Sequence, residues 1–152
     1  MLLFLHWVGF SVWLGAQMTF MVWGMATNKA GLEAWAHTWI TLEKVQRVLV
    51  LPAAVIATVS GIVLTMRLAG QSGDRGGAVW LMGMQGAGLV AGILAILVVT
   101  PLTRKMARAA KRSLDAGERR PEAELVRVKL AWAGTITGNL ILLSLGFVAF
   151  GR

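Results

Sequence analysis

Long apolar stretches alternate with shorter polar ones along the chain. Four apolar stretches stand out, over residues 2–24, 45–66, 78–100 and 130–150. Each can cross a hydrocarbon layer of about 30 Å as a helix, in which the backbone satisfies its own hydrogen bonds. The period-two alternation of strands is missing from all four. The pattern predicts an all-α protein, a bundle of four transmembrane helices that run up, down, up and down.

The polar stretches between the predicted spans differ from one another. Residues 69–77 are rich in glycine, which is typical of a short turn. Residues 25–44 mix tryptophan with charged residues and allow a helical extension of the second span. Residues 101–129 are strongly basic, and we expect a helical extension beyond the membrane between the third and fourth helices, broken at Pro121.

The composition agrees with a membrane protein. Hydrophobic residues make up 57% of the chain and charged residues only 14%, whereas about a quarter of a soluble domain is charged. Four spans consume nearly all of the 152 residues, so we expect a single domain over 1–152 with no soluble catalytic domain. The absence of cysteine excludes disulfides, cysteine-ligated iron–sulfur clusters and covalently attached haem within this chain.

The positive charge is concentrated next to the apolar runs. The net charge is +8, and nine of the fifteen lysines and arginines lie between residues 104 and 129. Anionic lipid headgroups can neutralise charges in this position, so we expect the lipid bilayer and not nucleic acid as the partner. The residues predicted to contact headgroups are Arg104, Lys105, Arg108, Lys111 and Arg112.

The distribution of charge also predicts an orientation. Twelve lysines and arginines lie in or beside residues 25–44 and 101–129, and the other three are Arg67, Arg75 and Arg152. The positive-inside rule then places 25–44 and 101–129 in the cytoplasm and both termini outside, in a multi-pass protein of the cell (inner) membrane. Tryptophans at both predicted interfaces agree, with Trp7 and Trp80 outside and Trp23, Trp35, Trp39 and Trp132 inside.

His6 is the strongest candidate for chemistry, because an ionisable group inside a span is costly and usually faces the bundle interior. Its helix face also carries Gly9, Phe10, Trp13, Gln17 and Gly24. Its depth matches that of Met66, Met82 and Gln85, so we consider a haem or copper site formed by His6 with these side chains. The alternative is a histidine near the headgroups, hydrogen-bonded to Gln85 or water, with the methionines as packing residues.

The other polar residues of the spans favour structural roles. His37 lies about a membrane thickness from His6 in the predicted topology, and we expect it at the inner interface. The amides of Gln17, Gln85 and Asn139 are expected to bridge helices by hydrogen bonds. No span core contains an acidic residue, so a proton-coupled transporter has no carboxylate relay.

Two glycine pairs predict close helix packing. Gly88 and Gly92 are spaced four apart in the third span, and Gly134 and Gly138 in the fourth. Small residues at this spacing let two helix backbones approach closely. The partner helix of each pair is either within the bundle or in another protein. Pro52, near the start of the second span, is expected to kink that helix or to free a carbonyl.

A family resemblance rests on the first two spans. The first contains Leu5-His6-Trp7-Val8-Gly9 and Trp13-Leu14-Gly15, and the second contains Arg47, Pro52 and Ser60-Gly61. These segments resemble small four-helix membrane proteins related to the copper-resistance D family and to an uncharacterised family of predicted membrane proteins. The resemblance implies binding of haem b or handling of copper in some members. It also extends to protoporphyrinogen oxidases that pair this histidine with a lysine in a later span, but residues 78–100 contain no lysine.

Two functions follow as hypotheses. The first is a non-catalytic accessory or structural subunit that packs against other membrane protein subunits in a larger complex, one concerned with electron transfer. The second is a membrane redox or metal-handling protein that binds haem b or copper through His6. A carrier for small solutes ranks third, because the spans lack charged residues.

Overall fold

The structure, a computed structural model, describes residues 1–69 and 78–150, and every regular element in this part is helical. Most of the predicted turn over 69–77, with Arg75, lies outside the described residues, as do Arg152 and the side chain of Trp80. In chain order the elements are α1 (Leu2–Ala26), η1 (Thr27–Lys29), α2 (Leu32–Val45), η2 (Gln46–Val50), α3 (Leu51–Ala69), α4 (Ala78–Leu94), η3 (Ala95–Val99), α5 (Thr100–Ala116) and α6 (Pro121–Phe150).

These elements join into long helices. The π-helical segment η2 connects α2 to α3 without a break, and η3 connects α4 to α5 in the same way. Four helices of the described residues are long and apolar enough to cross a membrane, over Leu2–Lys29, Leu32–Arg67, Leu81–Ala116 and Pro121–Phe150. The predicted all-α bundle of four long helices is therefore confirmed.

The helical extensions predicted over residues 25–44 and 101–129 are confirmed. Most of residues 25–44 and 101–129 are helical, and Pro101 lies inside a long helix instead of at the start of a connection. The reason is an apolar face on each extension. Trp35 and Trp39 of α2 pack in one buried cluster with Met106 and Ala110 of α5. Amphipathic segments that bury against each other continue their helices beyond the apolar runs.

Each π-helical segment ends two residues before a proline. The N–H of Leu51, next to Pro52, donates to the carbonyl of Gln46, and the N–H of Thr100, next to Pro101, donates to Ala95. Proline has no N–H and crowds the carbonyl four residues before it, and a wider turn relieves that crowding. The irregularity expected at Pro52 is thus a π turn, and Pro101 has a second one.

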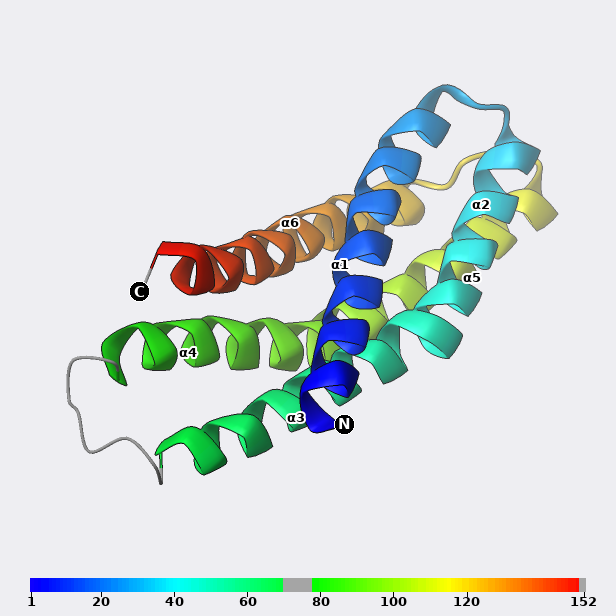
Figure 1. Cartoon of the computed structure of the whole chain (residues 1–152). Helices are drawn as coiled ribbons and strands as arrows, with labels where there is room; N and C mark the ends of the chain where they lie inside the picture. The colour runs from blue at the N-terminus through cyan, green and yellow to red at the C-terminus, as the bar shows by residue number, and fades with distance from the viewer. Residues whose placement is uncertain (70–77, 151–152) are drawn as a thin grey trace.

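The α elements pack as three pairs. In Figure 1, α1 lies along α3, α6 along α4, and α2 along α5.

Gly117, with a φ of 73°, ends α5 in the left-handed conformation that favours glycine. Pro121 begins α6, which confirms the predicted break. Arg119, between these two helices, donates to the carbonyls of Asn28 and Ala30 and so ties the two turns together.

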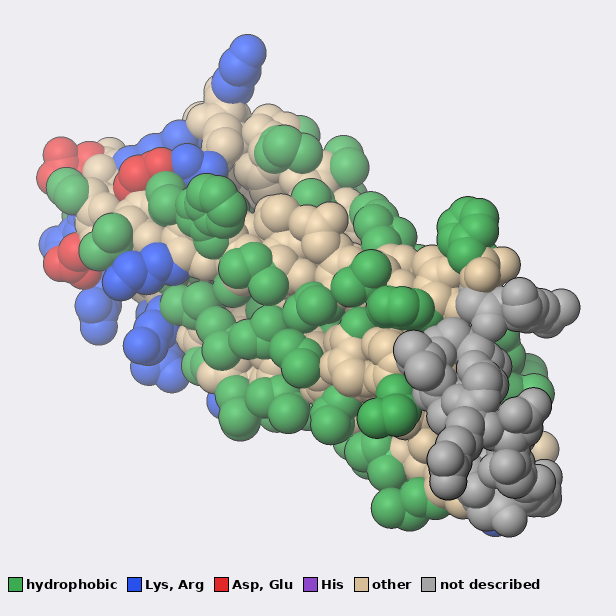
Figure 2. Space-filling model, turned by 90° about the vertical axis from the view of Figure 1, so that its left-hand side faces the viewer, with side chains coloured by type: hydrophobic (Ala, Val, Ile, Leu, Met, Phe, Trp, Pro, Cys, Tyr) green, Lys and Arg blue, Asp and Glu red, His purple; other side chains and the backbone are tan. Residues whose placement is uncertain are grey.

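The surface separates charge from apolar area. Figure 2 shows lysines, arginines and acidic residues gathered at one end of the molecule and hydrophobic side chains along its length. We call the end with the two turns, residues 27–31 and 117–120, the polar end, and the opposite end the far end. The five basic residues predicted to meet headgroups are exposed along α5: Arg104, Lys105, Arg108, Lys111 and Arg112. Their contact with lipid stays a prediction, as does the orientation in the cell.

The tryptophans near the polar end have two different environments. Trp23 and Trp132 are exposed, as expected at a membrane interface. Trp35 and Trp39 are buried between α2 and α5. The helical extensions use these two as core residues, and their place at the inner membrane interface stays a prediction.

Candidate functional site

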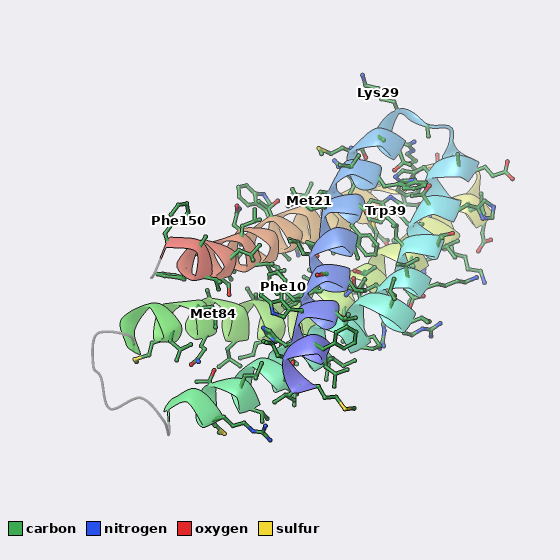
Figure 3. All side chains as sticks on the ribbon, in the orientation of Figure 1. Phe10, Met21, Lys29, Trp39, Met84 and Phe150 are labelled. Atoms are coloured by element: carbon green, nitrogen blue, oxygen red, sulfur yellow. The ribbon has the colours of Figure 1, made fainter. Side chains whose placement is uncertain are left out.

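A cavity of about 540 Å³ lies at the far end of the bundle. Residues of α1, α3, α4 and α6 form its walls, and Phe10 and Met84, labelled in Figure 3, belong to two of them. The walls are mostly apolar, with a few polar side chains, among them His6, Thr65 and Gln85. Concave, mainly apolar sites with a few placed polar groups are typical binding sites for small molecules.

The cavity exists because two tightly packed helix pairs diverge. In the first pair, a Cβ atom on Gly9 of α1 would lie 2.9 Å from the carbonyl oxygen of Ala53 on α3. In the second pair, a Cβ on Gly83 of α4 would lie 2.9 Å from the ring of Phe147 on α6. Towards the far end α3 and α4 separate from each other (Figure 1). The space between the two pairs is the cavity.

His6 is held in one orientation by the backbone of α3. Its Nδ1 atom lies 2.8 Å from the carbonyl oxygen of Ala57 and 3.2 Å from Oγ of Ser60. The Ser60 hydroxyl itself donates to the carbonyl of Ile56. A carbonyl oxygen only accepts hydrogen bonds, so the proton of the neutral imidazole is assigned to Nδ1. The lone pair then lies on Nε2, one of the two ring nitrogens through which histidines bind metals.

Gly61 provides the space for the imidazole. A Cβ atom at this position would lie 3.0 Å from Cε1 of His6 and 3.4 Å from Nδ1. The absent side chain lets the ring lie directly against α3, where it reaches the carbonyl of Ala57. Glycine is thus needed here for a close approach and not for an unusual backbone conformation.

Some of the other polar groups of the cavity wall have hydrogen-bond partners, and one does not. The amide of Gln85 on α4 donates to the hydroxyl of Thr65 on α3, so it bridges two helices as predicted. Oγ1 of Thr58 is buried and has no hydrogen-bond partner among the described residues. Both threonines line the cavity. The Thr58 hydroxyl lies at the contact between α3 and α4, because a Cβ on Gly92 would meet it directly.

The structure brings together most of the residues that were grouped with His6. Gln85 and Met66 line the same cavity, although Met66 is 71% exposed. Met82 is 69% exposed and lies outside the lining, whereas Met84, two residues along, is part of it. The predicted neighbourhood of Met82 and His6 is therefore wrong, because Met84 occupies the inward position on α4. The amino-acid sequence alone places Met82 and Met84 at similar depth and does not show which of them faces the cavity.

Among the described residues, no cluster of the usual metal-binding side chains accompanies His6. Within residues 1–69 and 78–150 there is no group of three or more histidine, aspartate or glutamate side chains placed to hold a metal ion. His37 is exposed on α2 near the polar end, roughly 30 Å from His6 along the axis of α1. The expectation that the two histidines do not share a site is confirmed.

The remaining predicted residues pack helices. Gly92 faces Thr58 of α3, and Gly88 faces Ser144 of α6, so this pair serves two contacts within the bundle. Gly134 and Gly138 both face Gln17 of α1. The amide of Gln17 donates to the carbonyl of Gly134 over 2.9 Å, which is the predicted bridge between helices.

Asn139 departs from the predicted pattern. It is exposed on α6, and it forms none of the bridges between helices that the other two amides make. The prediction of a bridge within this chain is therefore wrong for Asn139. The cause is its position on the helix, because it lies on the face that turns away from α1 and α4.

Comparisons with protein-family models, with curated proteins and with solved structures found no match to this chain. The resemblance to the copper-resistance D group thus stays a prediction. The candidate site rests on its own geometry.

Proposed function

We propose that the protein is a membrane redox protein that binds haem b in the far-end cavity, where Nε2 of His6 would hold the iron. The observation that carries the proposal is the hydrogen bond from Nδ1 to the carbonyl of Ala57, because it leaves the lone pair on Nε2 of a histidine that lines a large apolar cavity. A histidine that served only to join α1 and α3 would need the space at Gly61, but it would not need the cavity.

The composition of the wall favours a macrocycle over a bare metal ion. A free copper or iron ion needs several protein ligands, and one imidazole among apolar walls does not supply them. Haem brings four nitrogen ligands of its own and needs only axial ones from the protein. A volume of about 540 Å³ also suits a large planar molecule better than an ion. Copper binding by His6 with Met66 or Met84 is the less favoured alternative.

Haem b, when bound, supplies one-electron redox chemistry. The chain itself contributes three things to such a site. Nε2 of His6 would hold the iron, the carbonyl of Ala57 fixes the tautomer of His6, and the apolar walls would exclude water, which influences the redox potential. Arg67, next to Met66 of the lining, places a cation at the far end, where the carboxylates of a haem need a counter-charge.

The optical spectrum of the protein tests this proposal. We expect protein purified in mild detergent to show the Soret band of haem b, or to acquire it when haem is titrated into the colourless protein. His6→Ala should weaken haem binding by about tenfold or more, since it removes the axial ligand. His37→Ala is the matched control and should bind haem like the parent.

Two results would refute the proposal. The first is a parent protein that takes up no haem. The second is a His6→Ala variant with the affinity and spectrum of the parent. Metal analysis of the same preparations distinguishes copper from haem, because copper at His6 would appear without a Soret band.

The accessory-subunit hypothesis stays a prediction. Exposed apolar side chains along the helices do not support it by themselves, because lipid covers such a surface equally well. Its partners and any link to an electron-transfer complex have no residue-level support beyond the exposed amide of Asn139.

A further inference from the structure

The exposed face of α6 carries a polar group in the middle of its apolar part. Asn139 lies nine residues after Leu130 and eleven before Phe150. At about 1.5 Å per residue, its carboxamide is roughly 13 to 17 Å from either end of this apolar part, which an asparagine side chain cannot span. A carboxamide left in lipid has no hydrogen-bond partner, and that is costly.

The residues around Asn139 are spaced as in a helix–helix interface. Successive members of one stripe along α6 are separated by three or four residues, the spacing of a left-handed coiled coil. The stripe, which we call the α6 seam, comprises Trp132, Ile136, Asn139, Leu143, Gly146 and Phe150.

The large members of the seam are open to the surroundings. Trp132 is 67% exposed, and Leu143 is 52% exposed. Phe150, 90% exposed, points away from the other helices in Figure 3. A Cβ on Gly146 would meet nothing within 4 Å, so the backbone is accessible there to a second helix. No other helix among the described elements covers these positions.

We propose that the α6 seam binds the α6 seam of a second copy of this chain, and that Asn139 pairs with Asn139 of that copy. A carboxamide has both a donor and an acceptor, so two identical carboxamides related by a twofold axis satisfy each other with two hydrogen bonds. Copies in one membrane share one orientation, so an axis along the membrane normal makes the two helices parallel. Identical residues then meet at the same depth, which the seam requires.

The seam ends at the edge of the apolar layer. Lys129 is the next position of the same series towards the polar end, and it is exposed. Two lysines at equivalent positions repel each other in a dry interface. At the membrane surface their long side chains can turn outward into water and headgroups. The dimer contact is thus limited to residues 132–150.

Disulfide crosslinking in the membrane tests the proposal, because the chain has no cysteine of its own. Single variants Ile136→Cys and Leu143→Cys place a thiol in the seam and leave Asn139 intact. Val59→Cys, on an exposed part of α3, is the matched control for random collision. We expect a disulfide-linked dimer from both seam variants under mild oxidation and none from the control.

Asn139→Leu in the Leu143→Cys background tests the carboxamide itself. Two membrane hydrogen bonds of average strength correspond to about a tenfold change in association constant, and the crosslinked fraction should fall accordingly in dilute membranes. The proposal fails if the seam variants crosslink no faster than Val59→Cys, or if Asn139→Leu leaves the crosslinking unchanged. It also fails if the thiol at position 143 crosslinks only to a different protein. Haem binding is measured separately, so failure here leaves the His6 proposal untouched.

Discussion

The imidazole of His6 on α1 lies against Gly61 on α3, where a Cβ atom would come within 3.0 Å of Cε1. The same ring donates from Nδ1 to the carbonyl of Ala57, one turn before Gly61. The space at Gly61 therefore allows the ring to reach the carbonyl that fixes its tautomer. Residues that orient a metal-binding histidine affect affinity without touching the metal.

Gly61→Ala should therefore impair haem binding. The added methyl group pushes the ring away from α3 and lengthens the bond to Ala57, and we expect about tenfold weaker affinity for haem. Optical titration measures the affinity. Gly86→Ala on α4 is the control, because a Cβ there meets nothing within 4 Å. Equal affinities of the two variants would show that the ring position is unimportant.

Gly9→Ala should destabilise the pair formed by α1 and α3. The new Cβ would lie 2.9 Å from the carbonyl oxygen of Ala53 and 3.1 Å from the amide nitrogen of Ala57, and neither backbone atom can move alone. We expect a loss of about 1 to 3 kcal/mol, seen as a lower Tm in detergent. Gly15→Ala on the same helix has open space and should keep or raise the Tm.

Trp35→Ala should loosen the polar end. Trp35 is 2% exposed between α2 and α5, and the guanidinium of Arg119 lies 5.0 Å from its ring centroid. Loss of a buried tryptophan costs about 3 to 5 kcal/mol. Trp132→Ala, at an exposed position, should change the stability far less. Hydrogen exchange of α2 and α5 would locate the effect, and equal exchange in both variants would contradict the buried cluster.

The contact between Gln46 and Thr100 predicts that substitutions of the two residues have unequal effects on stability. The amide of Gln46 donates to Oγ1 of Thr100 over 3.3 Å, and its own oxygen Oε1 is buried without a partner among the described residues. Thr100→Val leaves the amide without an acceptor and should cost about 1 to 3 kcal/mol. Gln46→Leu removes both buried polar atoms and should be nearly neutral. A double variant no less stable than Gln46→Leu, measured by thermal unfolding, would support this account; two equal single losses would contradict it.

The amino-acid sequence alone predicts the parts of the fold that depend on one helix face. The 3.6-residue period places Gly9, Trp13 and Gln17 on the same side as His6, and all three are buried. It does not predict that α2 and α5 bury their faces against each other. A tryptophan beside an apolar run fits an interface and a core equally well, and the choice depends on a partner helix far away in the chain.

For the candidate site, the sequence predicts His6 and its neighbour Gln85 but not the groups that hold the imidazole in place. His6 and Gln85 line one cavity, as their similar depth indicates. The carbonyl of Ala57 fixes the tautomer of the histidine, but a backbone acceptor has no signature in the sequence. The role of Gly61 is equally hidden, because glycine is frequent in this chain and only the packing shows which glycine a ring requires.

The most direct test of the His6 site is rescue of the missing ligand by free imidazole. His6→Gly should lose the haem spectrum of the parent, and added imidazole should restore it by binding where the side chain was. His37→Gly should have the parent spectrum with or without imidazole. A His6→Gly variant that keeps the parent spectrum before imidazole is added would show that another residue holds the haem, and would contradict the account.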